Sequence, residues 1–345
     1  MKKILPIFTV GTCLLNASLN AQESDLDFLE NDFKVGYEAE INTNATSSSR
    51  GRGSINFGES YISLNASYKN KIKVVLTGKL ETLFENNNIS FNDDFSIAEF
   101  IEEAFIEIRE VGGTPTAIIV GKQPIPFGQN VQAMPLFQNN PLADLQEIKE
   151  VYGLTVDFTE GLFNIFDQVE IAAFETEKGN LSIGTINGMS LRLSKMLTDN
   201  LLLTIGHAEL GNDHLSTGHE SKTSVGLVGE SKDGMLVGWV EGILFSNNPS
   251  YPNSKFAITA GSMVRVHRTT DVIVELNYVA KNVQQYAIGT RTALTSNLSM
   301  GLELRFNDYK DGRKDEVVLG VNATYVFGSS GFRPNDEYLF DDDKN

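Results

Sequence analysis

The residues best able to do chemistry in this sequence are its histidines, because an imidazole can act as a base or bind a metal. There are four of them, His207, His214, His219 and His267. His214 and His219 lie near Asp213 at a spacing that a metal site allows, and the alternative is a solvated polar loop. No G-x-S-x-G element and no Cys/His zinc pattern accompanies them. We therefore expect no enzymatic activity, no cofactor and no metal site.

The other candidates are charged side chains that recur singly along short segments of alternating polarity. The segment 298–306 shows the pattern most clearly: Leu298, Met300, Leu302, Leu304 and Phe306 alternate with Ser299, Gly301, Glu303 and Arg305. Successive side chains of a β-strand point to opposite faces, so such a segment has one apolar face and one wetter face. We assign the apolar face to lipid and the wetter face to a lumen. The segments 33–41, 72–80, 272–280 and 317–327 alternate in the same way.

The connections between about sixteen such segments follow a parity rule. Every second connection is a tight turn with Gly, Asn or Asp, the residues that accept a positive φ. These turns are expected near Asn70 and at 112–114, 160–161, 198–200, 232–234, 268–270 and 296–297. The other connections are expected to be longer loops, at 44–57, 86–98, 125–148, 211–221, 246–254 and 307–314, with a short exception at 281–282.

This pattern predicts an all-β protein: a transmembrane antiparallel up-and-down β-barrel of about 16 strands in a bacterial outer membrane. An even strand number puts both termini on the periplasmic side and the long loops outside. Aromatic residues near segment ends favour interfacial girdles: Tyr68, Phe84, Tyr152, Phe158, Phe245, Phe256, Tyr286, Phe306, Tyr325 and Phe327. A soluble secreted all-β domain also alternates and remains an alternative.

Composition and targeting signals agree with export. Residues 1–21 read as a signal peptide, with Lys2 and Lys3 before an apolar run. The single cysteine, Cys13, lies within it. We expect a periplasmic N-terminal tail at 22–32, the barrel at 33–328 and an acidic periplasmic C-terminal tail at 329–345. The formal net charge of −17 excludes a general nucleic-acid binder, and no later stretch is long and apolar enough for a transmembrane helix.

The loop 125–148 is the longest expected connection, and it carries Phe127, Pro135, Leu142 and Asp144. Because two dozen residues with this apolar content are unlikely to stand free in water, we expect the loop to fold into the lumen and narrow it. The alternative is an external cap over the barrel mouth.

Pore-lining and constriction residues follow from the inward face of the strands and from this loop. The set is Arg109, Gln123, Phe127, Asp144, Glu147, Arg192, Glu241, Arg265, Glu275, Arg291, Glu303 and Arg305. Glu103 and Glu170 also belong to the inward charges. Mixed signs argue against a basic phosphate ladder, and the overall negative charge predicts a mild preference for cations. The alternative is that opposite charges pair across the wall and only stiffen it.

One stretch of the chain resembles known outer-membrane proteins. It is Ala-Ile-Ile-Val-Gly-Lys-Gln-Pro-Ile-Pro-Phe-Gly at 117–128, followed by Pro141-Leu142, by Glu147 and Glu150, and by Tyr152-Gly153. This order of elements resembles the siderophore-porin family (the LbtU type) over roughly residues 100–175, and the Pro-Phe-Gly element is also similar to phosphate-selective porins. The resemblance implies a monomeric or trimeric diffusion pore, or a pore for ferric siderophores.

The function expected from the sequence is an outer-membrane porin for small hydrophilic solutes. Its partners would be outer-membrane lipids and lipopolysaccharide, its solutes, and other copies of the chain in a homotrimer; no nucleic acid is expected. The rival is a non-conducting surface barrel, an adhesin or structural protein.

Overall fold

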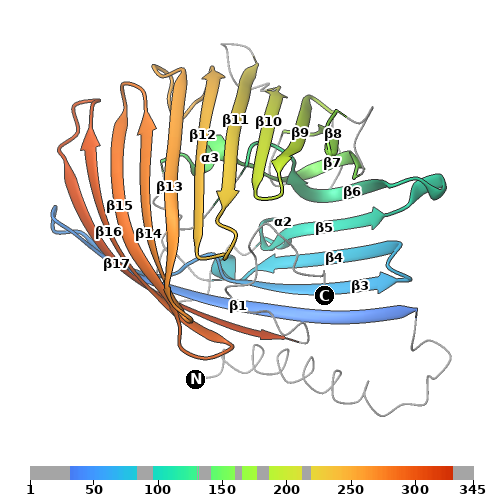
Figure 1. Ribbon diagram of the computed structural model, residues 1–345, viewed down its shortest axis with the longest axis horizontal. Helices are drawn as coiled ribbons and strands as arrows, with labels where there is room; N and C mark the ends of the chain where they lie inside the picture. Colours follow the sequence, from blue (N-terminus) through green and yellow to red (C-terminus); the bar gives the residue numbers. More distant parts are fainter. Residues whose placement is uncertain are drawn as a thin grey trace.

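The computed structural model describes residues 32–83, 96–129, 131, 141–159, 165–176, 186–211 and 219–328. These residues form a single antiparallel sheet that curls on itself (Figure 1). Its strands are β1 (Phe33–Ser48), β2 (Gly53–Phe57), β3 (Tyr61–Tyr68), β4 (Ile72–Lys79), β5 (Ile101–Ile108), β6 (Thr116–Ile125), β7 (Ile148–Phe158), β8 (Gln168–Phe174), β9 (Gly188–Thr198), β10 (Leu201–Leu210), β11 (Glu220–Glu230), β12 (Leu236–Ser246), β13 (Phe256–His267), β14 (Thr270–Val279), β15 (Val283–Ala293), β16 (Leu298–Tyr309) and β17 (Glu316–Gly328). Short helical turns are η1 (Leu80–Leu83), α2 (Ile97–Phe100), η2 (Val111–Gly113) and α3 (Ala143–Gln146).

The sheet closes into a barrel of 16 strands when β2 and β3 are counted as one, which confirms the predicted fold. β2 and β3 both pair with β1, so they act as one interrupted strand. On its other edge β1 pairs with β17, with Asn44 opposite Asn322 and Ile41 opposite Tyr325. In Figure 1 blue β1 accordingly lies beside red β17. Closure leaves neither sheet edge unpaired, as a barrel in lipid requires.

The outer surface is an apolar belt, as the alternation predicts. On β16, Leu302 and Leu304 are 53% and 46% exposed, whereas the intervening Glu303 is 2% exposed. Aromatic pairs lie near strand ends on this surface, with ring centroids 6.3 Å apart for Tyr286–Phe306 and 6.0 Å apart for Tyr325–Phe327. An outer surface of this kind is stable in lipid and would aggregate in water. Within the described ranges, no helix has the length and apolar character to span a membrane.

Most described connections follow the parity rule, and one expectation is wrong. The turns at 199–200 and 268–269 are tight, and the exceptional link at 280–282 is short. The predicted first loop at 44–57 is instead two paired strands joined by a turn at 49–52. Outward side chains on this part of β1 are small (Thr43, Ala45 and Ser47), so the sequence shows no apolar alternation there.

Some expectations lie outside the described residues. These are the signal peptide, nearly all of the N-terminal tail, the C-terminal tail, Phe84, Pro135, the turn at 160–161, and most of the loops at 86–98 and 211–221, including Asp213 and His214. Phe245 was predicted as a girdle residue, and this is wrong: its side chain is buried inside the barrel.

Candidate functional site

The connection between β6 and β7 lies against the inner wall of the barrel in the parts that the structure describes, 126–129, 131 and 141–147. Phe127, Leu142 and Leu145 are almost fully buried. They belong to one apolar cluster with inward residues of eight strands, here called the connection cluster. Its members are Ile125, Phe127, Leu142, Leu145, Ile148, Val151, Ala172, Phe174, Ala208, Ile243, Phe245, Ala257, Val279 and Val283. Figure 1 shows α3 behind β11 and β12, consistent with these contacts.

A single carboxyl group on β12 holds both limbs of this connection. The backbone amide of Gln129 donates to Glu241 Oε1 at 3.0 Å, and the Gln146 side chain donates Nε2–H to Glu241 Oε2 at 3.1 Å. Glu241 is 1% exposed. Because hydrogen bonds to a buried carboxyl group are stronger than average, this residue fixes where the connection lies.

Two other strands and the loop between β12 and β13 contribute polar contacts to the same limbs. The Ser190 hydroxyl on β9 donates to the Pro126 carbonyl, and the Tyr251 hydroxyl after β12 donates to the Pro141 carbonyl. On β11, Lys222 Nζ donates to the Glu147 carbonyl at 3.4 Å. The connection is therefore fastened along its described length and does not rest on apolar contact alone.

Glycines in the wall allow the backbone of the connection to approach. A Cβ added at Gly206 would lie 2.7 Å from the Gly128 nitrogen, and one at Gly226 would lie 2.4 Å from the Gln129 side chain. Gly128 itself has φ +60°, a conformation that favours glycine. The Pro-Phe-Gly element thus ends in a glycine for two reasons, backbone conformation and closeness to the wall.

The inward face of β11–β15 is less polar than the sequence predicts. Val228, Val237, Trp239, Met263, Ile273 and Ala287 form a second buried cluster, and Val131 of the connection packs on it. The assignment of this whole face to a water-filled lumen is therefore wrong for this side of the barrel. These residues pack with one another and with the connection, which sequence alternation alone does not reveal.

Four of the predicted pore-lining charges, Glu241, Glu275, Glu303 and Arg305, are buried in the wall of β12, β14 and β16. Arg305 is 1% exposed and contacts Glu303, and Glu275 accepts a hydrogen bond from Asn277 at 2.5 Å. Gln123 on β6 is also buried, where it donates to the Ile119 and Gly153 carbonyls at 3.1 and 3.0 Å. The side chains of these residues are packed into the barrel wall.

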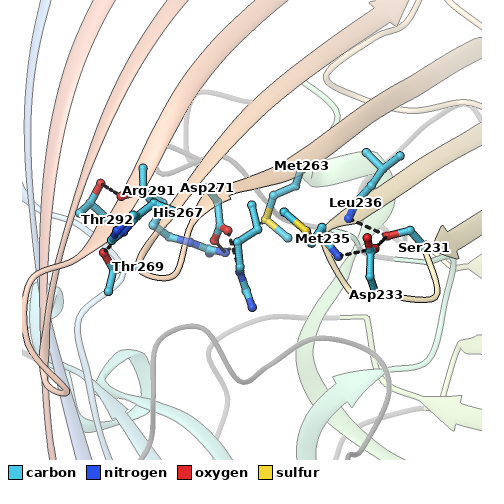
Figure 2. Close-up of polar contacts among 12 residues, drawn as sticks. Ser231, Asp233, Met235, Leu236, Met263, His267, Thr269, Asp271, Arg291 and Thr292 are labelled. Atoms are coloured by element: carbon cyan, nitrogen blue, oxygen red, sulfur yellow. Dashed lines mark hydrogen bonds and ion pairs between the residues drawn. The ribbon is translucent and has the colours of Figure 1, made fainter.

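Two further predicted residues, Arg265 and Arg291, form a cluster with Asp271 at the turn end of β13–β15. Asp271 lies 3.2 Å from Arg265 Nε and 3.6 Å from Arg291 Nη2, and Arg291 also contacts the Met263 sulfur at 3.5 Å. Figure 2 shows Asp271, Arg291 and Met263 side by side beside the turn that carries Asp233. Arg109 lies after β5 and donates Nε–H to Glu107 at 2.5 Å. The side chain of Asp144 lies outside the described residues.

Two cavities lie on the opposite side of the interior. The larger one has a volume of about 600 Å³ and is bounded by β1, β3, β4, β5 and the start of β7; its charged lining is Glu38, Glu40, Glu59, Glu102, Glu103, Glu147, Lys73, Lys79 and Lys149. The smaller one, of about 390 Å³, is lined by Gln123, Phe127, Glu147, Lys149, Glu170 and Arg192 among others. Glu147 and Lys149 line both, so the cavities meet at the end of the connection.

Of the predicted site residues, Gln123, Phe127, Glu147 and Arg192 therefore line a cavity, and Arg192 pairs with Glu170 with Nη2–Oε1 at 2.8 Å. Of the charged residues of the larger cavity, Glu147 belongs to the predicted pore-lining set and Glu103 to the predicted inward charges, whereas the other four glutamates and the three lysines belong to neither. The sequence does contain a signal for Glu38 and Glu40, because they alternate with apolar residues on β1 in the same way as the predicted residues Glu303 and Arg305 do on β16. Among the described residues, no group of three or more His, Cys, Asp or Glu could hold a metal ion.

Comparison with known proteins gives a fold and no family. No family model matches the chain, and no curated protein sequence matches it. Among solved structures, the outer-membrane channel DcaP of Acinetobacter baumannii is similar with a TM-score of 0.63 at 12% identity, over 86% of this chain and 98% of that one. The anion-selective porin from Comamonas acidovorans has a TM-score of 0.60 at 12% identity, over 86% and 100% of the two chains. The trimer form of OmpT, an outer-membrane protein of Vibrio cholerae, has a TM-score of 0.58 at 11% identity, over 86% and 100%.

These proteins share the closed barrel with this chain, and the resemblance to siderophore or phosphate-selective porins stays a prediction. The 16-stranded barrel and its apolar outer belt place the protein in a bacterial outer membrane.

Proposed function

We propose that this protein is a porin through which small hydrophilic solutes diffuse, with a lumen narrowed by the connection 125–148. The observation that carries the proposal is the division of the interior. The connection and the two apolar clusters pack against β6–β8 and β10–β15, and polar cavities remain beside β1 and β3–β9.

The size of the barrel supports this function. Sixteen strands enclose more space than their own side chains fill, and in porins this space is an aqueous channel. Packing one side with a loop reduces the channel to an off-centre passage, which limits solute size. The charged lining favours hydrated solutes over apolar ones.

The proposal includes assembly as a homotrimer. The support is the similar barrel of OmpT, whose structure is described as a trimer form. A large apolar outer surface allows either lipid or a second copy to cover it. Crosslinking in outer-membrane vesicles, followed by gel electrophoresis, would distinguish a trimer from a monomer.

Single-channel recording tests the central claim. Refolded protein in planar lipid bilayers should give discrete conductance steps, and liposomes that contain it should swell in solutions of small sugars. A folded barrel that produces neither steps nor swelling would overturn the proposal and favour the non-conducting surface barrel. Siderophore uptake, which the sequence resemblance implies, would require saturable passage of a ferric siderophore in the same liposomes.

A further inference from the structure

We infer that a buried cation site at Glu241 helps to dock the β6–β7 connection on the barrel wall, and that the site takes a monovalent metal ion, with Na⁺ as the best match. This inference goes beyond the proposed function, because it requires the folded barrel and the docked connection but not the passage of solutes. Its ligands would come from β11, β12 and both limbs of the connection.

The carboxyl group of Glu241 lacks a cationic partner within the described part of the chain. It is 1% exposed, and it accepts hydrogen bonds from the neutral Gln129 amide and the neutral Gln146 side chain. No lysine, arginine or histidine of the described ranges forms an ion pair with it. The connection cannot supply one either, because residues 126–147 contain no Lys, Arg or His. Since burial of an unpaired carboxylate is costly, a counter-ion would stabilise this arrangement.

Two amide groups beside this carboxylate have atoms without a hydrogen-bond partner in the described structure. They are Oε1 of Gln146, and both Oε1 and Nε2 of Gln129. Gln146 is 1% exposed, and because its Nε2 donates to Glu241, its Oε1 on the same carbon also lies close to that carboxylate. Buried polar atoms nearly always have a partner. Amide oxygens next to a carboxylate are the ligands that hard cations prefer.

The register of β10, β11 and β12 brings these oxygens to one small area of the wall. Gly206 lies opposite Ser224, and Gly226 lies opposite Glu241. A Cβ at Gly226 would lie 2.6 Å from Gln129 Oε1, and one at Gly206 would lie 2.9 Å from Ser224 Oγ. The Ser224 hydroxyl and the Gln129 amide therefore lie on the same part of the inner face as the carboxylate.

Gly128 leaves room for an ion next to these ligands. A Cβ at this position would lie 2.5 Å from Glu241 Oε1 and 3.5 Å from the Gln146 carbonyl oxygen. A carbon atom cannot approach an oxygen as closely as the first of these distances, whereas hard cations contact oxygen at about 2.3–2.6 Å. The position that excludes a side chain thus suits a cation.

The charge of the site favours a monovalent ion. Glu241 contributes one negative charge, and the oxygens of Gln129, Gln146 and Ser224 are neutral. One monovalent cation neutralises this set. A divalent cation would leave an excess positive charge in the low-dielectric interior, which is unfavourable.

Hydrogen exchange measured by mass spectrometry on the refolded protein in neutral detergent tests the inference. Backbone amides of residues 126–129 and 141–147 should exchange about fivefold more slowly in NaCl than in N-methyl-D-glucamine chloride at the same concentration, because an ion that binds only the docked connection stabilises it by mass action. Glu241→Gln keeps the shape of the side chain and removes its charge, so this difference between the two salts should disappear.

Two further variants separate ion binding from a general loss of packing. Glu170→Gln is the matched control, because Glu170 is also buried but pairs with Arg192, and the effect of NaCl should remain. Gln146→Glu adds a second carboxylate and should change the preference from NaCl to CaCl₂ at equal ionic strength. The gel mobility of heated and unheated samples would show that each variant forms the barrel.

Three results would overturn the inference. The first is equal exchange of the unmodified protein in NaCl and N-methyl-D-glucamine chloride. The second is protection by CaCl₂ but not by NaCl, which would contradict a monovalent ion. The third is protection that increases as the pH falls and is the same in every salt, which would show that a proton neutralises Glu241. None of these results bears on conductance, so the porin proposal would stand or fall separately.

Discussion

Glu241 offers the sharpest test of the proposal that the β6–β7 connection narrows the lumen. Its carboxyl group accepts hydrogen bonds from Gln129 and Gln146, which lie on the two limbs of the β6–β7 connection. Replacing it with alanine removes both acceptors in one step and leaves the barrel strands paired through their backbones. The connection would then be held only by its apolar cluster and its remaining polar contacts.

The size of the effect follows from the contacts that are lost. A hydrogen bond to a charged group contributes about 1.5–3 kcal/mol, so two contribute roughly 3–6 kcal/mol before the freed donors regain partners. Taking about 3 kcal/mol as the net loss, the ratio of displaced to docked connection rises about 100-fold, since 1.4 kcal/mol is a factor of ten. Glu241→Gln should have a smaller effect, because one acceptor oxygen remains.

Single-channel recording of Glu241→Ala should show a larger mean conductance and frequent sub-states, with Glu241→Gln intermediate. Thr259→Val is the control, because Thr259 pairs with Glu241 on the neighbouring strand and is equally buried. The gel mobility of heated and unheated samples would show that each variant forms the barrel. A folded Glu241→Ala variant with unchanged conductance and no sub-states would refute the role of this carboxyl group.

Three other changes probe the wall and its turns. Gly226→Leu should displace the connection through a clash with Gln129 and destabilise its docking by about 1–3 kcal/mol, seen as altered conductance, whereas Gly238→Leu on the open outer face should not. Arg192→Gln should lower the unfolding temperature in detergent by leaving Glu170 without its ion pair, and Glu170→Gln in the same chain should restore part of the loss. The Lys195 side chain and the Met196 amide hold the pKa of Asp167, in the turn before β8, below its ordinary value. This interaction therefore stabilises the fold above the unfolded-state pKa and is lost as pH falls through the lower folded-state value, so Asp167→Asn should reduce the dependence of the unfolding temperature on acid pH.

The sequence predicts the barrel well because the alternation of apolar and polar residues along each strand shows which side chains point outward and which point inward. Leu302, Glu303 and Leu304 alternate in sequence and alternate between outside and inside in the structure. The upper part of β1 was missed because Thr43, Ala45 and Ser47 are small outward residues. Local polarity is enough to define a strand only where the outward side chains are large and apolar.

The same alternation does not predict which of the inward charged side chains are buried and which line a cavity. Glu303 and Glu38 have the same local pattern, yet the first is buried in the wall and the second lines a cavity. Burial inside the barrel depends on long-range packing, such as the contacts of Glu241 with residues of the β6–β7 connection about 100 positions away in sequence. Such a contact leaves no periodic signal in either segment.

The two apolar clusters also have a mechanical consequence. They pack against β6–β8 and β10–β15 from within, whereas, among the described residues, β1, β3, β4 and β5 contribute no residue to either cluster and border the larger cavity. Stiffness therefore varies around the circumference, and local fluctuations concentrate where internal packing is sparse. A thinner or thicker bilayer would deform these less densely packed strands first, so we expect the shape of the larger cavity to depend on lipid composition.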